Sequence, residues 1–230
     1  ERLATYGIGR PGQRVLDLGT GTGTVARGLA RSGCLVTGLD RSAELIEEAK
    51  RLDRQAGVTV HYVVAGAEHT GLADDGFDVV TAGQCWHWFD HGSIRREVRR
   101  LLVSGGRLVI AQFDWLPQRG NVAEATERLI EKHNPDWNLG GGTGLHPDYV
   151  RDVAVAGFDD IETFSFDVPV SYTHEAWRGR IRASAGVAAS LEPDRVARFD
   201  AELADLLTAH FPCQPLQIPH RVFAVISRSP

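Results

Sequence analysis

The first half of the chain alternates short apolar runs with segments whose apolar residues recur at helical spacing. A buried strand is predicted at Val15–Leu18, and a helix follows it at Thr24–Arg31. Ser42 is placed to cap a second helix that runs to about Gln55 and is stopped by Gly57. Further strands are predicted at residues 35–39, 58–64, 77–81 and 107–113. Strands that alternate with helices in this way predict a mostly parallel sheet with helices on both faces and a ligand site beyond the carboxyl ends of the strands.

The second half contains longer helical patterns and fewer strands. Helices are predicted near residues 121–133, 147–156, 173–189 and 192–210, with strands near 161–168 and 221–227. Two of these helices lie between the late strands. We therefore expect residues 1–170 and 218–230 to form the core domain and residues 171–217 to form a helical cap.

Composition and charge narrow the class of protein. The chain has 230 residues, of which 43% are apolar and 24% charged, as in an ordinary soluble globular protein. No run approaches the about 20 apolar residues of a membrane span, and no signal peptide pattern is present, so we expect a cytoplasmic protein with no membrane partner. The net charge of -5 gives no global attraction to nucleic acid. One predicted helix carries four arginines, which we expect to be solvated: Arg95, Arg96, Arg99 and Arg100.

The cysteines Cys34, Cys85 and Cys213 lie far apart and form no CxxC pair. We therefore expect reduced thiols rather than disulfides or a cysteine zinc site. No HExxH or paired carboxylate–histidine motif occurs, so no metal is expected. The chain contains no methionine, not even at position 1, and we expect that its natural start is missing.

A glycine-rich turn follows the first predicted strand in the stretch VLDLGTGTGT, residues 15–24. Such glycines admit a ligand close to the backbone, and GxGxxG is the fingerprint of dinucleotide sites. The strict pattern fails at Thr24, although a shifted frame is an allowed variant. Asp17 argues against a dinucleotide because its carboxylate would repel a pyrophosphate on the following helix, whereas it would attract an amine. An NAD(P)-dependent oxidoreductase is therefore the disfavoured alternative.

A second acid follows at the end of the next predicted strand. Asp40 closes the stretch VTGLD, where a carboxylate can accept two hydrogen bonds from a ribose diol. This feature is common to sites for many nucleosides. A ribose beside Asp40, an amine beside Asp17 and a close backbone between them match S-adenosylmethionine.

Four stretches resemble, in order and spacing, the successive motifs of class I S-adenosylmethionine-dependent methyltransferases: VLDLGTGTGTVARGLA, GLDRSAELIEEAK, AGAEHTGLADDGFDVV and LLVSGGRLVIAQF. The resemblance is to the small-molecule group called methyltransferase type 11 and runs from about Gln13 to Phe113. It implies an α/β fold with a Rossmann-like, doubly wound, seven-stranded sheet, mostly parallel with an antiparallel last strand. It also implies a helical segment ahead of ERLATYGIGRPGQ that folds over the cofactor.

The resemblance implies S-adenosyl-L-methionine as the cofactor and assigns its contacts by position. The acidic-glycine motif corresponds to Asp17 and the turn glycines, with Thr20 close to the methionyl part. Asp40 corresponds to the ribose-binding acid, and Arg41 follows near the adenine. The cofactor-binding residues matched in these two motifs are Asp17, Gly19, Thr20, Gly21, Gly23, Asp40 and Arg41.

The third motif departs from the family pattern. Many relatives have an aspartate before its alanine–glutamate pair, where it binds the adenine amino group. This chain has Gly66 there, followed by Ala67 and Glu68. We expect the backbone of Ala67 or the side chain of Glu68 to take over that contact.

The stretch AGQCWHWFD, residues 82–90, leaves the fourth predicted strand at its carboxyl end. Methyl transfer is an in-line displacement that needs alignment and, for some acceptors, a base. We expect Gln84 and Trp86 to line the cofactor, with the indole near the sulfonium. His87 is the candidate catalytic base because imidazole titrates near neutral pH. The alternative is a turn packed into the core with a hydrogen-bonded histidine at its edge, which involves Trp86, His87, Trp88, Phe89 and His91.

The predicted cap offers a feature for the methyl acceptor. Arg178 and Arg182 share one helix face at i, i+4 in YTHEAWRGRIRASAG. Facing the site they would suit a carboxylate-bearing acceptor, and facing water they would be solvated charges.

We therefore predict a methyltransferase that acts on a small-molecule acceptor. Oxygen, as a hydroxyl or a carboxylate, is the first choice for the accepting atom, with nitrogen and carbon open. The second alternative class is a non-catalytic S-adenosylmethionine-binding partner subunit. No feature of the sequence specifies an oligomeric state.

Overall fold

The computed structural model describes residues 2–230, which divide into two compact units. The first unit contains residues 2–112, 146–164 and 223–230, and the second contains residues 113–145 and 165–222. Each unit has its own hydrophobic core. The segment 171–217, predicted as a cap, lies within the second unit. Residues 113–145 were assigned to the core domain by sequence, but they belong to the second unit because their helix shares its apolar core.

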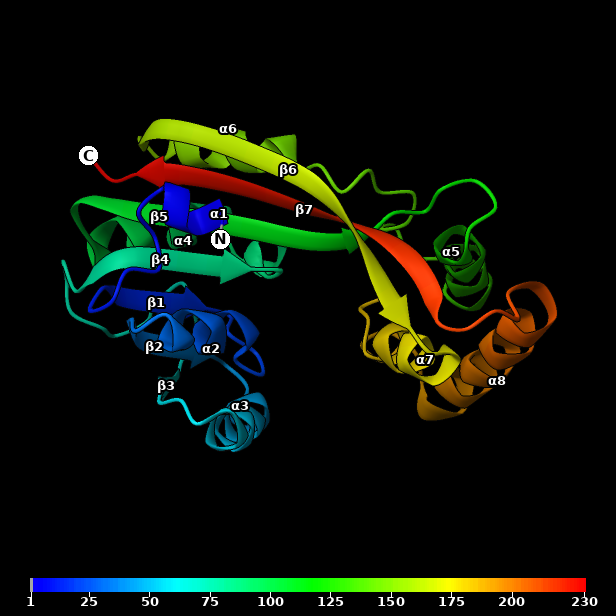
Figure 1. Cartoon of the computed structure of the whole chain (residues 1–230). Coiled ribbons are helices and arrows are strands. Elements are labelled where there is room, and N and C mark those ends of the chain that lie inside the picture. Colours follow the sequence, from blue (N-terminus) through cyan, green and yellow to red (C-terminus); the bar gives the residue numbers. More distant parts are fainter. Residues whose placement is uncertain (1) are drawn as a thin grey trace. The chain divides into compact units, whose positions relative to one another are not determined.

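The first unit is built from strands and helices that alternate along the chain (Figure 1). Its helices are α1 (Arg2–Thr5), α2 (Thr24–Arg31), α3 (Ala43–Ala56), the 3-10 turn η1 (Trp86–Trp88), α4 (His91–Leu101) and α6 (Pro147–Val155). Its strands are β1 (Arg14–Leu18), β2 (Leu35–Asp40), β3 (His61–Val64) and β4 (Phe77–Gly83). Three longer strands have residues in both units: β5 (Leu102–Trp115), β6 (Asp159–Tyr172) and β7 (Leu216–Arg228).

The strands form one seven-stranded sheet in the order β3-β2-β1-β4-β5-β7-β6. β1 pairs in parallel with β2 and β4, β2 with β3, and β4 with β5. β7 runs against its neighbours (Figure 1). The predicted Rossmann-like, doubly wound sheet with an antiparallel last strand is therefore confirmed.

Both faces of the central strands are buried, and successive side chains alternate between them. In β1, Leu16 and Leu18 pack in one cluster with side chains of α4 and α6, whereas Val15 packs on the other side with α2. A strand covered on both faces needs apolar residues at almost every position. This requirement explains why the first predicted strand is apolar on both faces at Val15, Leu16 and Leu18, with Asp17 as the one buried charged residue.

Helix α3 begins at the predicted cap and ends at Ala56, one residue beyond the predicted Gln55. Ser42 Oγ accepts a hydrogen bond from the Leu45 N–H, and Gly57 ends the helix with a left-handed φ of 66°. The third strand is shorter than the predicted 58–64. The N–H of Val58 donates to the carbonyl of Asp53, so the first residues of that range close the helix instead of joining the sheet.

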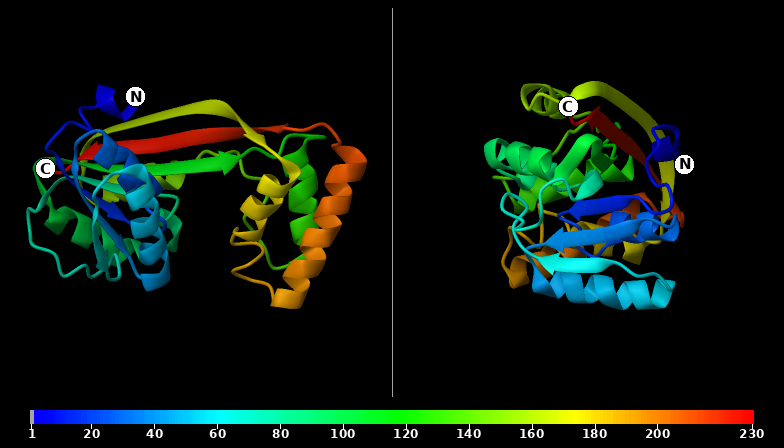
Figure 2. Two further views of the ribbon diagram at one scale, coloured as in Figure 1. Left: turned by 60° about the horizontal axis from the view of Figure 1, so that its bottom comes forward. Right: turned by 90° about the vertical axis from the view of Figure 1, so that its left-hand side faces the viewer.

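The second unit contains three helices that lie side by side (Figure 2): α5 (Val122–His133), α7 (His174–Arg182) and α8 (Pro193–His210). Trp177 of α7 is fully buried, and its Nε1–H donates to Thr126 Oγ1 of α5 at 3.0 Å. The predicted helix 173–189 ends at Arg182, and its last residues form turns. The core consists of Val122, Ala123, Leu129, Ile130, Trp177, Ile181, Val187, Phe199, Leu203, Leu207, Leu216 and Ile218.

The four arginines of α4 are not a uniformly solvated row. Arg96 and Arg99 are exposed, whereas Arg95 and Arg100 are half-buried and paired with acids. Arg95 lies 3.2 Å from Asp152 of α6. The expectation of solvation therefore fails for these two, because Arg95 pairs with an acid of α6 and Arg100 with Glu97 of its own helix.

Two expectations drawn from the composition can be compared with the structure, one on the cysteines and one on membrane-spanning helices. Cys34 and Cys85 are buried, Cys213 is exposed, and all three are free thiols. Within residues 2–230, no helix combines the length and the apolar character needed to cross a membrane.

Glu97 of α4 holds the loop that precedes β4. Its Oε1 accepts hydrogen bonds from the Thr70 N–H at 2.9 Å and the Thr70 hydroxyl at 2.6 Å, and its Oε2 accepts one from Arg100 Nε at 2.9 Å. Hydrogen bonding to Arg100 is the main cause that lowers the pKa of this carboxyl from 4.5 to about 2. An acid with a depressed pKa stabilises the fold above its unfolded pKa and loses that contribution as the pH falls.

We expect Glu97→Gln to lower the free energy of unfolding by about 2 kcal/mol at pH 7, because the buried carboxylate that accepts from Thr70 and Arg100 is lost. The difference should shrink as the pH falls from about 5 toward 2, and urea denaturation at several pH values measures it. Glu47→Gln is the matched control, since Glu47 is exposed and its pair with Lys50 is screened by solvent, so little change in stability is expected. A difference that is constant over this pH range would contradict the account.

Candidate functional site

The residues predicted for cofactor binding gather where β1, β2 and β4 end. Parallel pairing aligns Leu18 with Leu39 of β2 and with Ala82 of β4. The glycine-rich turn, Asp40 and Gln84 follow these positions in their respective segments. The topology therefore places them at the carboxyl edge of the sheet, where open α/β sheets bind ligands.

Asp17 is buried within β1, with 1% of its surface exposed. Its carboxylate accepts hydrogen bonds from the Thr20 hydroxyl at 2.7 Å and the Thr81 hydroxyl at 2.6 Å. Burial raises its pKa to about 6, while these hydroxyls and the Ala26 N–H partly offset the shift. Asp17 therefore holds the start of the turn through Thr20.

Asp40 holds the same turn from the other side. Its two oxygens accept hydrogen bonds from the Gly21 N–H and the Ser42 N–H, both at 2.9 Å. The carboxylate is half-buried and keeps lone pairs for further donors. Arg41, the next residue, is exposed.

The turn suits a ligand that lies against the backbone. Gly21 has a left-handed φ of 54°, and a Cβ added there would meet no atom within 4 Å. Bare backbone beside a partly exposed carboxylate fits the nucleoside cofactor predicted from sequence: Asp40 can accept from a ribose diol, and Gly21 leaves room for it.

A polar cluster missed by the sequence analysis supports the turn from behind. Asp53 of α3 accepts hydrogen bonds from Arg27 Nη1 at 2.6 Å and from the Tyr62 hydroxyl at 2.8 Å. Arg27 also donates to the carbonyl of Thr22 within the turn at 2.8 Å. The available signal was Asp53 itself, an acid at helical spacing from the buried Ile46 and Ala49.

The third motif places an acid beside its unusual glycine. A Cβ added at Gly66 would have Glu68 Oε2 as its neighbour, at 3.8 Å. Glu68 Oε1 accepts a hydrogen bond from the Asp90 N–H at 3.1 Å, which fixes the side chain. Ala67 is buried in the core, so only its backbone is available to a ligand.

The residues after β4 divide between core and edge. Gln84 is exposed and has a φ of 62°, a strained conformation for a residue other than glycine. Trp86 is fully buried, and its Nε1–H donates to Asp152 at 3.0 Å. The expectation that Trp86 lines the cofactor is corrected by this burial: the indole packs in the core, and Trp88 and His87 are the exposed members of the turn.

His87 belongs to a hydrogen-bonded series at the end of β5. Its Nδ1 lies 3.3 Å from Gln112 Nε2, and the same amide lies 2.8 Å from the Tyr149 hydroxyl. Gln112 and Tyr149 are both buried. The imidazole is therefore held by a fixed amide while its ring remains exposed beside Trp88, with 4.6 Å between the ring centroids.

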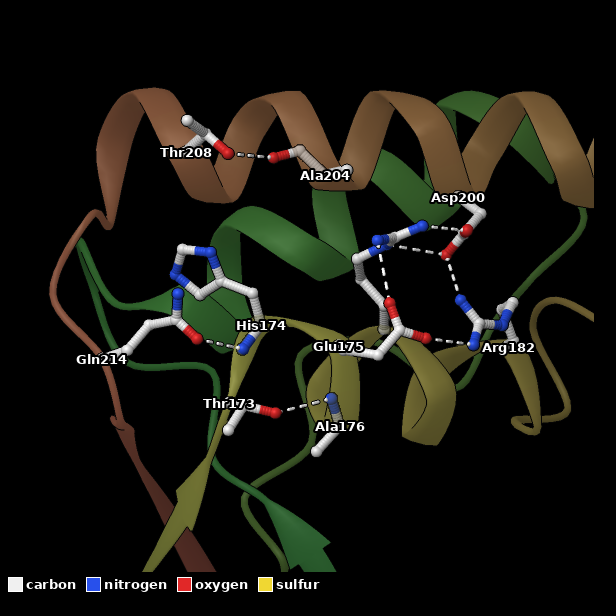
Figure 3. Close-up of polar contacts among 10 residues, drawn as sticks. Thr173, His174, Glu175, Ala176, Arg182, Asp200, Ala204, Thr208 and Gln214 are labelled. Atoms are coloured by element: carbon white, nitrogen blue, oxygen red, sulfur yellow. Dashed lines mark hydrogen bonds and ion pairs between the residues drawn. The ribbon is translucent and has the colours of Figure 1, made fainter.

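The paired arginines of the second unit are engaged by acids. Arg178 and Arg182 both bind Asp200 of α8 and Glu175 of their own helix. Figure 3 shows Arg182 between these two acids. Arg182 lies 2.6 Å from Asp200 Oδ1 and 2.9 Å from Glu175 Oε1. This balanced cluster links α7 to α8, so the carboxylate-binding alternative for these two residues is wrong in this arrangement.

The chain is similar to known methyltransferases. Residues 16–110 match the family model of the methyltransferase domain. A ubiquinone biosynthesis O-methyltransferase from Xanthomonas euvesicatoria pv. vesicatoria is 29% identical over 175 residues, covering 75% of this chain and 71% of the relative. The solved structure of the YcgJ protein from Bacillus subtilis has a TM-score of 0.63 at 21% identity, covering 99% of this chain and 96% of that one.

A further solved structure contains the cofactor predicted from sequence. Phosphoethanolamine N-methyltransferase 2 from Haemonchus contortus, in complex with S-adenosyl-L-methionine, has a TM-score of 0.57 at 21% identity. The match covers 99% of this chain and 51% of that one. At this identity the likeness concerns the fold.

Two neighbouring glycines of the turn offer a matched test of its packing. A Cβ at Gly23 would lie 2.4 Å from the Tyr62 hydroxyl, whereas one at Gly21 meets nothing, and both residues have left-handed φ. We expect Gly21→Ala to cost about 1 kcal/mol of stability from the backbone alone, and Gly23→Ala to cost about 2 kcal/mol more. Chemical denaturation of both variants measures the difference. Equal losses would show that Tyr62 does not pack on the turn as described.

Proposed function

The chain belongs to the class I S-adenosylmethionine-dependent methyltransferases and uses S-adenosyl-L-methionine, and from this premise we propose that it methylates a small molecule at oxygen. Family membership sets aside the two alternatives drawn from sequence, the NAD(P)-dependent oxidoreductase and the non-catalytic partner subunit. The observation that carries the choice of oxygen is the histidine held by a buried amide at the sheet edge. A hydroxyl is a weak nucleophile until a base removes its proton, whereas an amine already carries its lone pair. The O-methyltransferase relative supports the same choice.

In this proposal the turn and the strand ends bind the cofactor. Asp40 accepts from the ribose, and the bare backbone at Gly21 leaves room for the ligand, with Thr20 close to its amino-acid end. Gly19 and Gly23 allow the turn to pack closely against Cys85 and Tyr62 and so keep this shape. Glu68 Oε2 takes the adenine amino group in place of the acid absent at Gly66, with the Ala67 backbone beside it and Arg41 near the ring. When bound, S-adenosyl-L-methionine supplies a methyl group on a positively charged sulfur.

In this proposal Asp17 acts on the cofactor through its negative charge, because its carboxylate is buried. It is buried and already bonded to two hydroxyls, and its ionised form attracts the ammonium of the cofactor's amino-acid part. With its pKa at about 6, the carboxyl is only partly ionised in mildly acidic solution. Cofactor binding is therefore linked to loss of a proton from Asp17.

The base assignment depends on the orientation of the Gln112 amide. A neutral histidine that accepts a proton at Nε2 must carry its own proton on Nδ1 and donate it. In the structure the Gln112 amide nitrogen Nε2 faces His87 Nδ1 and donates to the Tyr149 hydroxyl. The base assignment requires the amide to be turned over, so that Oε1 accepts from His87 Nδ1–H and from the Tyr149 hydroxyl and the basicity of His87 is directed to Nε2.

A panel of phenols, hydroxy acids and amines tests the accepting atom directly. Release of S-adenosylhomocysteine identifies the acceptors, and fragmentation of the products by mass spectrometry locates the methyl group. We expect turnover of hydroxyl compounds to exceed that of matched amines. Transfer to amines alone would contradict the proposal while leaving family membership intact.

We expect S-adenosylhomocysteine, which carries the same ammonium, to bind at least about fivefold more tightly at pH 7 than at pH 5, because Asp17 becomes fully charged over this range. Asp17→Asn should bind about tenfold more weakly at pH 7 and show little pH dependence. Calorimetry at several pH values measures both effects. Asp205→Asn, at an exposed acid of α8, is the control and should match the parent protein. A pH dependence that survives in Asp17→Asn would rule out this origin.

We expect His87→Ala to lower kcat more than about tenfold while the affinity for S-adenosylhomocysteine stays within about twofold, because the base acts on the acceptor. His210→Ala, at an exposed position of α8, is the control. Steady-state kinetics with the best hydroxyl acceptor of the panel supply the readout. An unchanged kcat would assign His87 to the edge of a packed turn.

A further inference from the structure

The turn between β4 and α4 leaves one large aromatic side chain in solvent. Trp88, the last residue of η1, is 62% exposed. Its aromatic neighbours in the same segment pack inward: Trp86 is fully buried, and Phe89 lies against the same apolar core. Water therefore reaches the Trp88 indole although the rest of the turn is packed, so this ring is accessible to a ligand.

The turn that carries this indole is held in a fixed position. Trp86 Nε1–H donates to Asp152 of α6 at 3.0 Å, and the Trp86 ring meets Phe89 edge-on, with 6.1 Å between centroids. His91, which opens the following helix, contacts the same carboxylate. A ligand that stacks on the exposed indole therefore meets a segment that is already ordered, and it loses little affinity to ordering of the turn.

The same turn packs directly on the glycine-rich turn of the candidate cofactor site. A Cβ added at Gly19 would lie 2.8 Å from Cys85 Cβ and 3.4 Å from Phe89 Cζ. Cys85 Sγ also donates to the carbonyl of Leu18, at 3.1 Å. All of these residues belong to the first unit. The segment 85–89 therefore borders the cofactor turn, and its exposed side chains lie next to that site.

Trp88 also lies beside the candidate base. The ring centroids of His87 and Trp88 are 4.6 Å apart, and the ring planes are inclined by 46°. Both side chains are exposed. A planar molecule stacked on the indole would therefore have its edge close to the imidazole. A hydroxyl on an aromatic ring lies at that edge and in the ring plane, so stacking presents it to a base at the side.

We propose that Trp88 is the residue on which the methyl acceptor stacks, and that the acceptor is an aromatic compound with a hydroxyl on its ring. This inference rests on the proposed function, since it concerns the acceptor of the same site. In the transfer, His87 Nε2 takes the hydroxyl proton, and an oxygen lone pair forms the new bond to the methyl carbon. The bond from that carbon to sulfur breaks and its electrons stay on sulfur, which leaves S-adenosylhomocysteine and the methyl ether.

An indole favours an aromatic ring over a saturated one. Two flat rings can contact each other over a large area, and their quadrupoles favour offset stacking or edge-to-face contact. A puckered ring with the same carbon skeleton touches the indole with fewer atoms and gains less dispersion energy. Truncation of an aromatic side chain that stacks on a flat ring typically lowers affinity by a factor of about 5 to about 150.

The probes are 2-naphthol and decahydro-2-naphthol, which share a carbon skeleton and a hydroxyl but differ in aromaticity. Calorimetry with the full chain, saturated with S-adenosylhomocysteine, measures their affinities. We expect 2-naphthol to bind at least about fivefold more tightly than the saturated alcohol. Equal binding of the two probes, or no binding of 2-naphthol, would overturn the inference.

Substitutions of the indole test whether Trp88 is the origin of this preference. Trp88→Leu should reduce the preference to within about twofold, and Trp88→Phe should keep part of it. Because Trp88 is exposed, both variants should keep the thermal midpoint of the parent protein. A Trp88→Leu variant with the parent preference would overturn the inference.

Leu35→Ala is the control for loss of an exposed apolar side chain. Leu35 is 64% exposed, and it aligns with Arg14 at the start of β1, so it lies at the opposite edge of the sheet from the cofactor turn. This variant should leave the preference for 2-naphthol intact. Loss of the preference in Leu35→Ala would show that it does not originate at Trp88.

Affinity for the cofactor distinguishes contact with the acceptor from contact with the cofactor. An indole can also attract a positively charged sulfur. If Trp88 contacts the acceptor, Trp88→Leu should keep its affinities for S-adenosyl-L-methionine and S-adenosylhomocysteine within about twofold of the parent values. A loss of affinity for S-adenosyl-L-methionine alone would place the indole on the sulfur and overturn the inference.

Assay of methyl transfer to the same probes separates this inference from the proposed function. Trp88→Leu should raise KM for 2-naphthol at least about fivefold while kcat stays within about twofold. Binding of 2-naphthol that depends on Trp88, without methylation of its hydroxyl, supports the aromatic site and counts against transfer to oxygen. Methylation of both probes with equal efficiency, in the parent and in Trp88→Leu, supports oxygen transfer and overturns the aromatic site.

Discussion

A carboxylate buried at the end of the first strand constrains the whole cofactor region. Asp17 has no contact with bulk water to lower the energy of its charge, so the chain must supply donors around it. Thr20 does so from the glycine-rich turn and Thr81 from the neighbouring strand. The turn is therefore shaped by the need to satisfy this acid as well as by the need to admit a ligand.

The same turn is held by groups that are distant in sequence. Asp40 binds its backbone from the end of β2, and Arg27 ties its carbonyl to Asp53 on α3. The hydroxyl of Tyr62 fills the space beside Gly23 that any larger residue would need. Left-handed glycines would otherwise make this segment flexible, and the surrounding polar contacts restrict it to one conformation.

The sequence was informative where one local pattern decides the outcome. The apolar run ending at Leu18, the cap at Ser42 and the glycine at 57 each reflect nearby residues, and their elements were predicted correctly. Trp86 shows the limit: an indole after a strand suits a ligand wall and a core equally well, and the choice depends on Asp152, which lies on a distant helix. The support from Asp53 was missed for a similar reason, since its partners Arg27 and Tyr62 come from other elements.

The second unit shows how helix geometry decides between like residues. Arg178 and Arg182 are four residues apart and share the acids of one face, whereas Arg180 lies between them and reaches an aromatic ring instead. Spacing alone identified the pair but not its partners. Asp200, the acid shared by Arg178 and Arg182, lies on α8, whereas Trp115, which lies under Arg180, is on β5. Only the packing of these elements distinguishes the arginines that are held by acids from the arginine that stacks on a ring and keeps its N–H donors available.

The position of β7 has a consequence for how the protein is made. This strand lies between β5 and β6 in the sheet, although it follows both in the chain. During synthesis β5 and β6 emerge from the ribosome well before the strand that joins them, and each must wait with an unpaired edge. Completion of the sheet is therefore a late event in which residues 216–228 are inserted between two strands already made.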